Sequence, residues 1–129
     1  MNSKDHERQF LLMENQVNEA VLVIDNIQKV FPDSQAAELS YIILADFYTM
    51  FEEYDLAESS LLMLAKNYPE SNYAAEALLD AALNAEKRES NGFRQSMQLL
   101  NQLINTYSDS PLVFFAMRHQ GDLLRKASD

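Results

Sequence analysis

The sequence has no cysteine and no tryptophan, and its 129 residues include only two glycines and three prolines. Without cysteine, the chain forms no disulfide, has no thiolate nucleophile and cannot build a zinc site of the cysteine type. This absence leaves the compartment open, because it suits a periplasmic protein and a cytosolic protein equally. Few glycines and prolines leave little material for hairpin turns, while Ala, Leu, Glu, Gln and Met are abundant. This composition favours an all-α fold.

Positive charge is also scarce. The sequence has ten Lys and Arg residues and 20 Asp and Glu residues, so its formal net charge is -10. Such a chain repels a phosphate backbone, so we expect no nucleic-acid partner. The acidity is explained equally well by a solvated surface and by a site for a basic partner. The 47% hydrophobic content is enough to bury a core in one domain of this length.

Long apolar runs are absent as well. The longest, residues 112–117, is far too short to cross a bilayer, and residues 1–8 are polar and charged. The sequence contains no signal segment and no cysteine for lipidation. We therefore expect a soluble chain with no direct membrane insertion, unless an anchor lies outside these residues.

Apolar residues recur at helical spacing through nearly the whole chain. The pattern is clearest in residues 41–71, where two amphipathic segments flank an acidic turn at 52–55. The apolar face of the first segment consists of Tyr41, Leu44, Ala45 and Tyr48, and that of the second of Ala57, Leu61 and Leu64. Ser34 is placed to cap the first helix, and Asp55 with Glu58 predicts a capping box at the start of the second. The two segments form a helical hairpin whose apolar stripes need further cover.

A short motif ends three of the predicted helices. It reads Phe31-Pro32-Asp33-Ser34, Tyr68-Pro69-Glu70-Ser71 and Tyr107-Ser108-Asp109-Ser110, so that the aromatic residue returns after 37 and then 39 positions. A period in this range is typical of a helical repeat array. It divides the chain into units at 1–34, 35–71, 72–110 and 111–129, the last incomplete, with about seven helices. Residues 4–31 form either one long helix or two helices joined near residues 15–18.

The pattern resembles the tetratricopeptide repeat. Its order of large, small and aromatic positions and its closing proline are reproduced by Tyr41, Leu44, Ala45, Tyr48, Ala57, Leu61, Leu64 and Pro69. Ser96 and Ser108 depart from the usual alanine and proline. The resemblance covers nearly the whole chain and implies a single domain built as a right-handed superhelical array of antiparallel helix hairpins. The unit endings are similar to those of bacterial cell-envelope members, such as the Tol-Pal-associated protein and the outer-membrane assembly lipoprotein. This similarity implies the periplasm or cell envelope, with the cytoplasm as the alternative.

The resemblance also implies a binding groove lined by the first helices of the hairpins. The residues expected to face it are Leu39, Ile42, Asp46, Met50, Glu76, Leu79, Leu83, Phe115, Arg118 and Asp122. The expected partner is another protein, bound as a peptide or a helix, and the protein then acts as a scaffold. For each of these residues, contact with a neighbouring helix is an equally good interpretation.

The last predicted helix supports a second hypothesis. It lacks a following helix to cover the stripe of Val113, Met117, Leu123 and Leu124. Either the chain is truncated from a longer array, or its exposed end associates with another copy. The alternative function is therefore a homo-oligomerisation module that uses the N-terminal and C-terminal helices.

No pattern in the sequence points to catalysis. His6 and His119 are far apart, and neither is spaced from another ligand as metal binding requires. A glycine-rich phosphate loop and a serine-elbow motif are both missing. The acidic residues Glu52, Glu53 and Asp55 lie in a turn, where carboxylates usually cap a helix. We expect a protein that is not an enzyme and has no catalytic residue, cofactor or metal.

Overall fold

The computed structural model describes residues 3–88 and 91–128, apart from the side chains of Phe10 and Met13, and all secondary structure in these residues is helical. The helices are α1 (Ser3–Val30), α2 (Gln35–Met50), α3 (Tyr54–Asn67), α4 (Ala74–Ala85), α5 (Gly92–Thr106) and α6 (Leu112–Ser128). The predicted all-α class is confirmed. The six helices of the described residues are close to the predicted count of about seven, and of the two alternatives for residues 4–31 the single long helix is the one observed, because α1 runs unbroken through residues 15–18. That stretch contains no helix breaker, and Val17 within it is buried.

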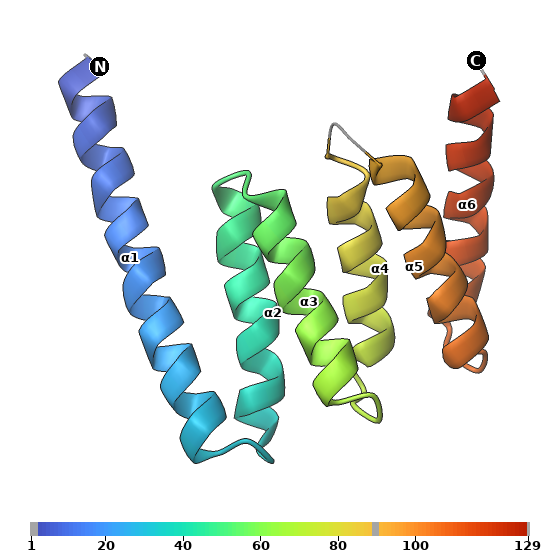
Figure 1. The fold of residues 1–129 in the computed structure, drawn as a ribbon, viewed down its shortest axis with the longest axis horizontal. Coiled ribbons are helices and arrows are strands. Elements are labelled where there is room, and N and C mark those ends of the chain that lie inside the picture. Colours follow the sequence, from blue (N-terminus) through green and yellow to red (C-terminus); the bar gives the residue numbers. More distant parts are fainter. Residues whose placement is uncertain (1–2, 89–90, 129) are drawn as a thin grey trace.

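The six helices stand in a row, and consecutive helices run antiparallel (Figure 1). Each helix packs on the next one in the chain, and α4 also contacts α6. The first half of α1 extends beyond α2 at one edge of the row (Figure 1). None of the helices in the described part of the chain is both long and apolar enough to cross a membrane.

The repeated motif forms the same turn three times. In each copy the serine N–H donates to the carbonyl of the aromatic residue three positions earlier, with N···O distances of 3.1, 3.0 and 2.9 Å for Ser34, Ser71 and Ser110. The serine hydroxyl oxygen then accepts a bond from a backbone N–H at the start of the next helix, donated by Ala37, Tyr73 and Leu112 respectively. These bonds satisfy N–H groups that a helix start leaves without partners. The cap predicted at Ser34 is confirmed.

The aromatic residues of the motif tie each turn to the one before it. The Tyr68 hydroxyl donates to the Pro32 carbonyl at 2.6 Å, and the Tyr107 hydroxyl donates to the Pro69 carbonyl at 2.8 Å. In both cases the acceptor is the residue that follows the aromatic position of the preceding unit. Phe31 occupies this position in the first unit and has no hydroxyl to donate.

The core is centred on α4, which lies between α3 and α5. Nine of its 12 residues are buried, most of them alanines. Small side chains let the neighbouring helices approach closely, and the large buried residues of the flanking helices fill the remaining space. The largest fully buried side chains are Leu64, Leu78, Leu100 and Leu103.

The start of α3 differs from its predicted capping box. The helix begins at Tyr54, and its N-cap residue Glu53 makes no side-chain cap bond. The carboxylates of Asp55 and Glu58 instead face Arg88, which follows α4, at N···O distances of 3.5 and 3.4 Å. A long-range ion pair therefore takes the place of the local cap.

Candidate protein-binding site

The helices α2, α4 and α6 form one face of the array, although another helix separates them in sequence. Thr49 Oγ1 of α2 donates to Asn84 Oδ1 of α4 at 3.2 Å. At the other side of α4, Glu86 Oε2 lies 2.6 Å from His119 Nε2 of α6. The side chains of α2, α4 and α6 that point away from α3 and α5 are called the α2–α4–α6 face below.

Three carboxylates dominate the α2–α4 part of this face. Asp80 is half-buried, and burial raises its pKa from 3.8 to about 6, with the nearby charges of Glu76 and Asp46 acting in the same direction. Asp80 forms no ion pair with any described residue. The site therefore concentrates negative charge around a carboxylate that has lost part of its hydration.

The predicted residues of α2 and α4 differ in how much surface they offer. Asp46, Met50 and Glu76 are exposed, whereas Leu39, Ile42 and Leu83 are half-buried. Leu79 is only 7% exposed and belongs to the core cluster, so it offers little area to a partner. The prediction did not include Ile43, which is half exposed, or Asp80. Helical spacing could have found both, because Ile43 follows Leu39 by four positions and Asp80 follows Glu76 by four.

The α6 part of the face has a different character. Phe115, Arg118 and Asp122, which were all predicted to face the groove, line a shallow hollow of about 310 Å³ together with His119. Phe115 and Arg118 are exposed, and Asp122 forms an ion pair with Arg125. The structure thus brings an aromatic ring and a guanidinium together at one end of the face, and carboxylates at the other.

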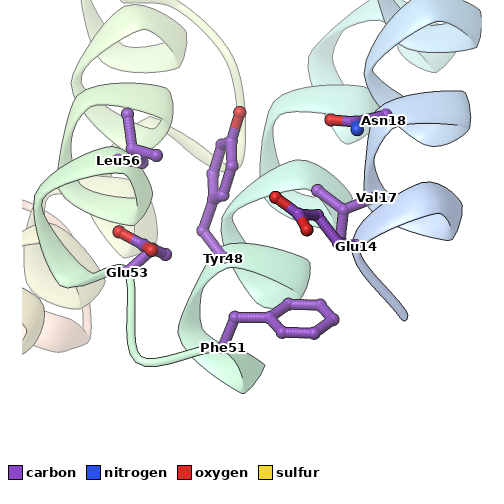
Figure 2. Close-up of a pocket in the computed structure, with 7 residues that line it drawn as sticks. All are labelled: Glu14, Val17, Asn18, Tyr48, Phe51, Glu53 and Leu56. Atoms are coloured by element: carbon purple, nitrogen blue, oxygen red, sulfur yellow. The ribbon is translucent and has the colours of Figure 1, made fainter. Parts of the chain in front are cut away.

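A second hollow, which the sequence analysis did not predict, lies between α1 and the α2–α3 turn. It has a volume of about 240 Å³ and is lined by Glu14, Val17, Asn18, Tyr48, Phe51, Glu53 and Leu56. Figure 2 shows the Glu14 carboxylate facing the Tyr48 ring, with Phe51 at one end pointing toward α1. Two carboxylates and an apolar floor make this hollow suited to a cationic or polar side chain.

In the next unit, the position equivalent to this hollow is filled by an ion pair. A shift of 37 positions relates Asn18, Val21 and Phe51 to Asp55, Glu58 and Arg88. Arg88 reaches across that second position to the two carboxylates, and Gln95 donates to Glu58 at 3.2 Å. The first unit has an uncharged residue at each of these three positions, so the same ion pair cannot form between α1 and the α2–α3 turn.

Neither metal chemistry nor similarity assigns a function to these surfaces. In residues 3–88 and 91–128, no group of three or more His, Asp or Glu side chains is arranged to hold a metal ion. No protein-family model matches the chain, and no curated protein is significantly similar to it. Function has to be inferred from the surfaces themselves.

Proposed function

We propose that this protein is a non-catalytic scaffold of the tetratricopeptide-repeat type, which binds a segment of another protein on its α2–α4–α6 face. Support comes from the repeated turn, the repeated tyrosine bond to the preceding turn, and the placement of alternate helices on one face. A right-handed superhelical course of the helix pairs is part of this proposal. The unit endings favour a role in a bacterial cell-envelope assembly.

The observation that carries the proposal is the position of Asp80. A half-buried carboxylate next to Asp46 and Glu76, without a basic neighbour among the described residues, is destabilised in its ionised form. A Lys or Arg side chain of a partner would supply the missing counter-charge in a partly desolvated place, where an ion pair is less screened than on an open surface. Binding would thus relieve a local electrostatic penalty.

The apolar surroundings of the three carboxylates define the rest of the partner. Ile43 and Met50 lie on the same side of α2 as Asp46 and are exposed. They offer area to apolar side chains, while the charges fix the register of the bound segment. The favoured partner is a peptide or helix with a basic residue next to apolar ones.

The experiment uses a library of random peptides displayed on phage, selected on the immobilised protein. We expect enrichment of Lys or Arg next to apolar residues. A synthetic peptide of the selected sequence should bind Asp80→Lys at least about tenfold more weakly than the original protein, a loss of ~1.4 kcal/mol. Fluorescence anisotropy measures both affinities. Leu79→Lys is not a suitable test of the face, because the Leu79 side chain is buried. Met50→Lys is suitable, because the Met50 side chain is exposed.

Asp109→Lys is the matched control. It makes the same change of charge at an exposed residue of the last turn and should leave the affinity close to that of the original protein. Equal losses in Asp80→Lys and Asp109→Lys would show that only the overall charge matters. Selection of acidic peptides would also refute the proposal.

A further inference from the structure

The last helix has the face of a first helix in a pair, but the second helix is missing from the described residues. The aromatic period makes Tyr41, Leu78 and Met117 equivalent positions of α2, α4 and α6. Tyr41 is 7% exposed and Leu78 is fully buried, because α3 and α5 cover them. Met117 is 54% exposed. The position that anchors each internal helix pair is therefore uncovered on α6.

Neighbouring positions of α6 repeat this contrast. Leu124 is exposed, whereas its equivalent in α4, Ala85, is fully buried. Gly121 has no atom near the place where a side chain would begin, whereas Ala45 and Ala82 at the equivalent positions are buried. Met117, Gly121 and Leu124 lie along one side of α6, and we call this stripe the α6 edge.

The first helix also has an uncovered face, on the side where a preceding helix would pack. It ends in the same turn as α3 and α5, and it packs on the helix that follows it, but no described helix precedes it. Val23 of α1 is equivalent to Ser60 of α3 and Leu99 of α5. These two are 7% and 4% exposed, while Val23 is 59% exposed. Val23 lies with Ala20, Ile27 and Val30 on one stripe of the helix, which we call the α1 edge.

We propose that the two edges cover each other between copies of this chain. The α6 helix of one copy packs against α1 of the next, antiparallel and in the register in which α2 packs against α3. This register places Met117 near Ile27 and Leu124 near Ala20. The first half of α1 then extends past the junction, as it already extends past α2 (Figure 1). The proposal does not depend on the α2–α4–α6 face, which the junction leaves open.

The charges of the two helices favour this pairing over pairing of like edges. The α6 helix carries three basic residues and one acidic residue, whereas the part of α1 that lies in the junction, residues 17–30, carries two acidic residues and one basic residue. Two copies of α6, or two copies of α1, would bring like net charges together. The junction is head to tail, so it repeats from copy to copy and gives a chain of copies, or a ring where the rotation closes, and not a two-fold dimer.

The first test uses two variants that each remove one edge. Val23→Glu and Met117→Glu change exposed side chains, so both should keep the far-ultraviolet circular dichroism of the original protein. We expect the mass of the original protein, measured by light scattering, to rise steadily with concentration. Each variant alone should stay monomeric, whereas an equimolar mixture should form a one-to-one pair. In that pair the intact α6 edge of Val23→Glu meets the intact α1 edge of Met117→Glu.

Leu22→Glu is the matched control on α1. Leu22 is adjacent to Val23 and also exposed, but its equivalents Ser59 and Gln98 are exposed within the array, so it lies off the edge. This variant should associate like the original protein. Equal loss in Leu22→Glu and Val23→Glu would show unspecific apolar contact and refute the proposal. Dimers of Val23→Glu alone would show pairing of two α6 edges, and a monomeric original protein at every concentration would show that the edges do not bind each other.

A second test predicts that one substitution tightens the association between copies. In the internal turns, Tyr68 and Tyr107 donate to the carbonyl one position after the preceding aromatic residue. At the proposed junction, Phe31 faces the Ser108 carbonyl of the preceding copy and cannot donate. Phe31→Tyr should therefore tighten association by roughly two- to tenfold, the effect of one added hydrogen bond, without changing the isolated chain. Weaker or unchanged association in this variant would contradict the register.

Discussion

Replacement by alanine should lower the free energy of unfolding at one of the two glycines of the chain and raise it at the other. Gly92 is buried at the start of α5, directly after Asn91, which has a left-handed backbone with φ of 58°. A Cβ atom at Gly92 would lie 2.6 Å from the Ala85 carbonyl oxygen and 3.4 Å from Glu86 Cα. Both are backbone atoms at the end of α4 and cannot rotate away. In Gly92→Ala, α4 and α5 must therefore separate, and we expect the free energy of unfolding to fall by about 1–3 kcal/mol.

Gly121 provides the matched control. It lies inside α6, and apart from its chain neighbours and the nearby backbone of its own helix, no atom lies within 4 Å of the place where its Cβ would be built. Alanine restricts the unfolded chain and favours the helix, so Gly121→Ala should raise the free energy of unfolding by about 0.5–1 kcal/mol. The alanines at the equivalent positions of α2 and α4 show that this side chain also fits a helix junction.

Urea unfolding followed by circular dichroism measures both differences. The protein should be kept dilute, because association of copies would add its own stabilisation. The expected gap between the two variants is at least about 1.5 kcal/mol. A Gly92→Ala protein as stable as Gly121→Ala would refute the close approach of α4 and α5 at this point.

Three further substitutions test buried polar groups. Asp80→Asn should raise stability at pH 7 by on the order of 2 kcal/mol, because burial and the neighbouring carboxylates raise the Asp80 pKa from 3.8 to about 6. In the original protein, the protonated Asp80 carboxyl contributes its full stabilisation below pH 3.8 and loses it as the pH rises through 6. The free energy of unfolding of Asp80→Asn, measured by urea titration, should not show this decline. Arg88→Ala leaves the buried Glu58 without its ion-pair partner and should lower stability at pH 7 by about 2–3 kcal/mol. Burial raises the Glu58 pKa, so the carboxyl can take up a proton and the loss should be smaller at pH 5 than at pH 7. Ser96→Ala should raise the thermal midpoint, with a gain of about 1 kcal/mol, because the buried Ser96 hydroxyl has no hydrogen-bond partner among the described residues. A loss of stability in Ser96→Ala would point to an unseen partner of the hydroxyl.

The helices and turns could be predicted from the sequence because local chemistry sets them. The motif that starts at Phe31, Tyr68 and Tyr107 ends a helix and caps the next one with bonds between residues two or three positions apart. The partners in these bonds are close in sequence, so their spacing can be recognised without knowledge of distant contacts. The continuity of α1 was left open by the sequence, because an uninterrupted periodic pattern fits one helix as well as two.

The local sequence could not show whether the capping box expected at Asp55 and Glu58 would form. Local spacing allowed it, but Arg88, 30 positions after Glu58, competes for both carboxylates. An ion pair in a partly buried place outweighs a cap that the helix start can also satisfy with solvent. Only the packing of α3 against the end of α4 brings the guanidinium there.

The exposure of the residues expected on the α2–α4–α6 face could be predicted only in part. Periodicity places Met50 and Leu79 on the outer sides of their helices, yet Met50 is exposed and Leu79 is buried. Leu79 belongs to the core cluster of the central helices, whereas Met50 is the last residue of α2. The hollow between α1 and the α2–α3 turn was not predicted, because its lining residues come from three helices and a turn that only the packing of the chain brings together.

The distribution of buried surface links the stability of the array to its association. The helices α2, α3, α4 and α5 each pack on the helix before and the helix after them, whereas within the described residues α1 and α6 each pack on a sequence neighbour on one side only. In repeat arrays stability is approximately a sum of unit terms and interface terms, so the two ends should unfold first. Covering Met117 and Val23 would add an interface term to both ends at once. Hydrogen exchange should therefore slow in α1 and α6 as the protein concentration rises, while exchange in α4 stays unchanged. Equal slowing in all helices would mean that unfolding is global and that the ends are not separate units.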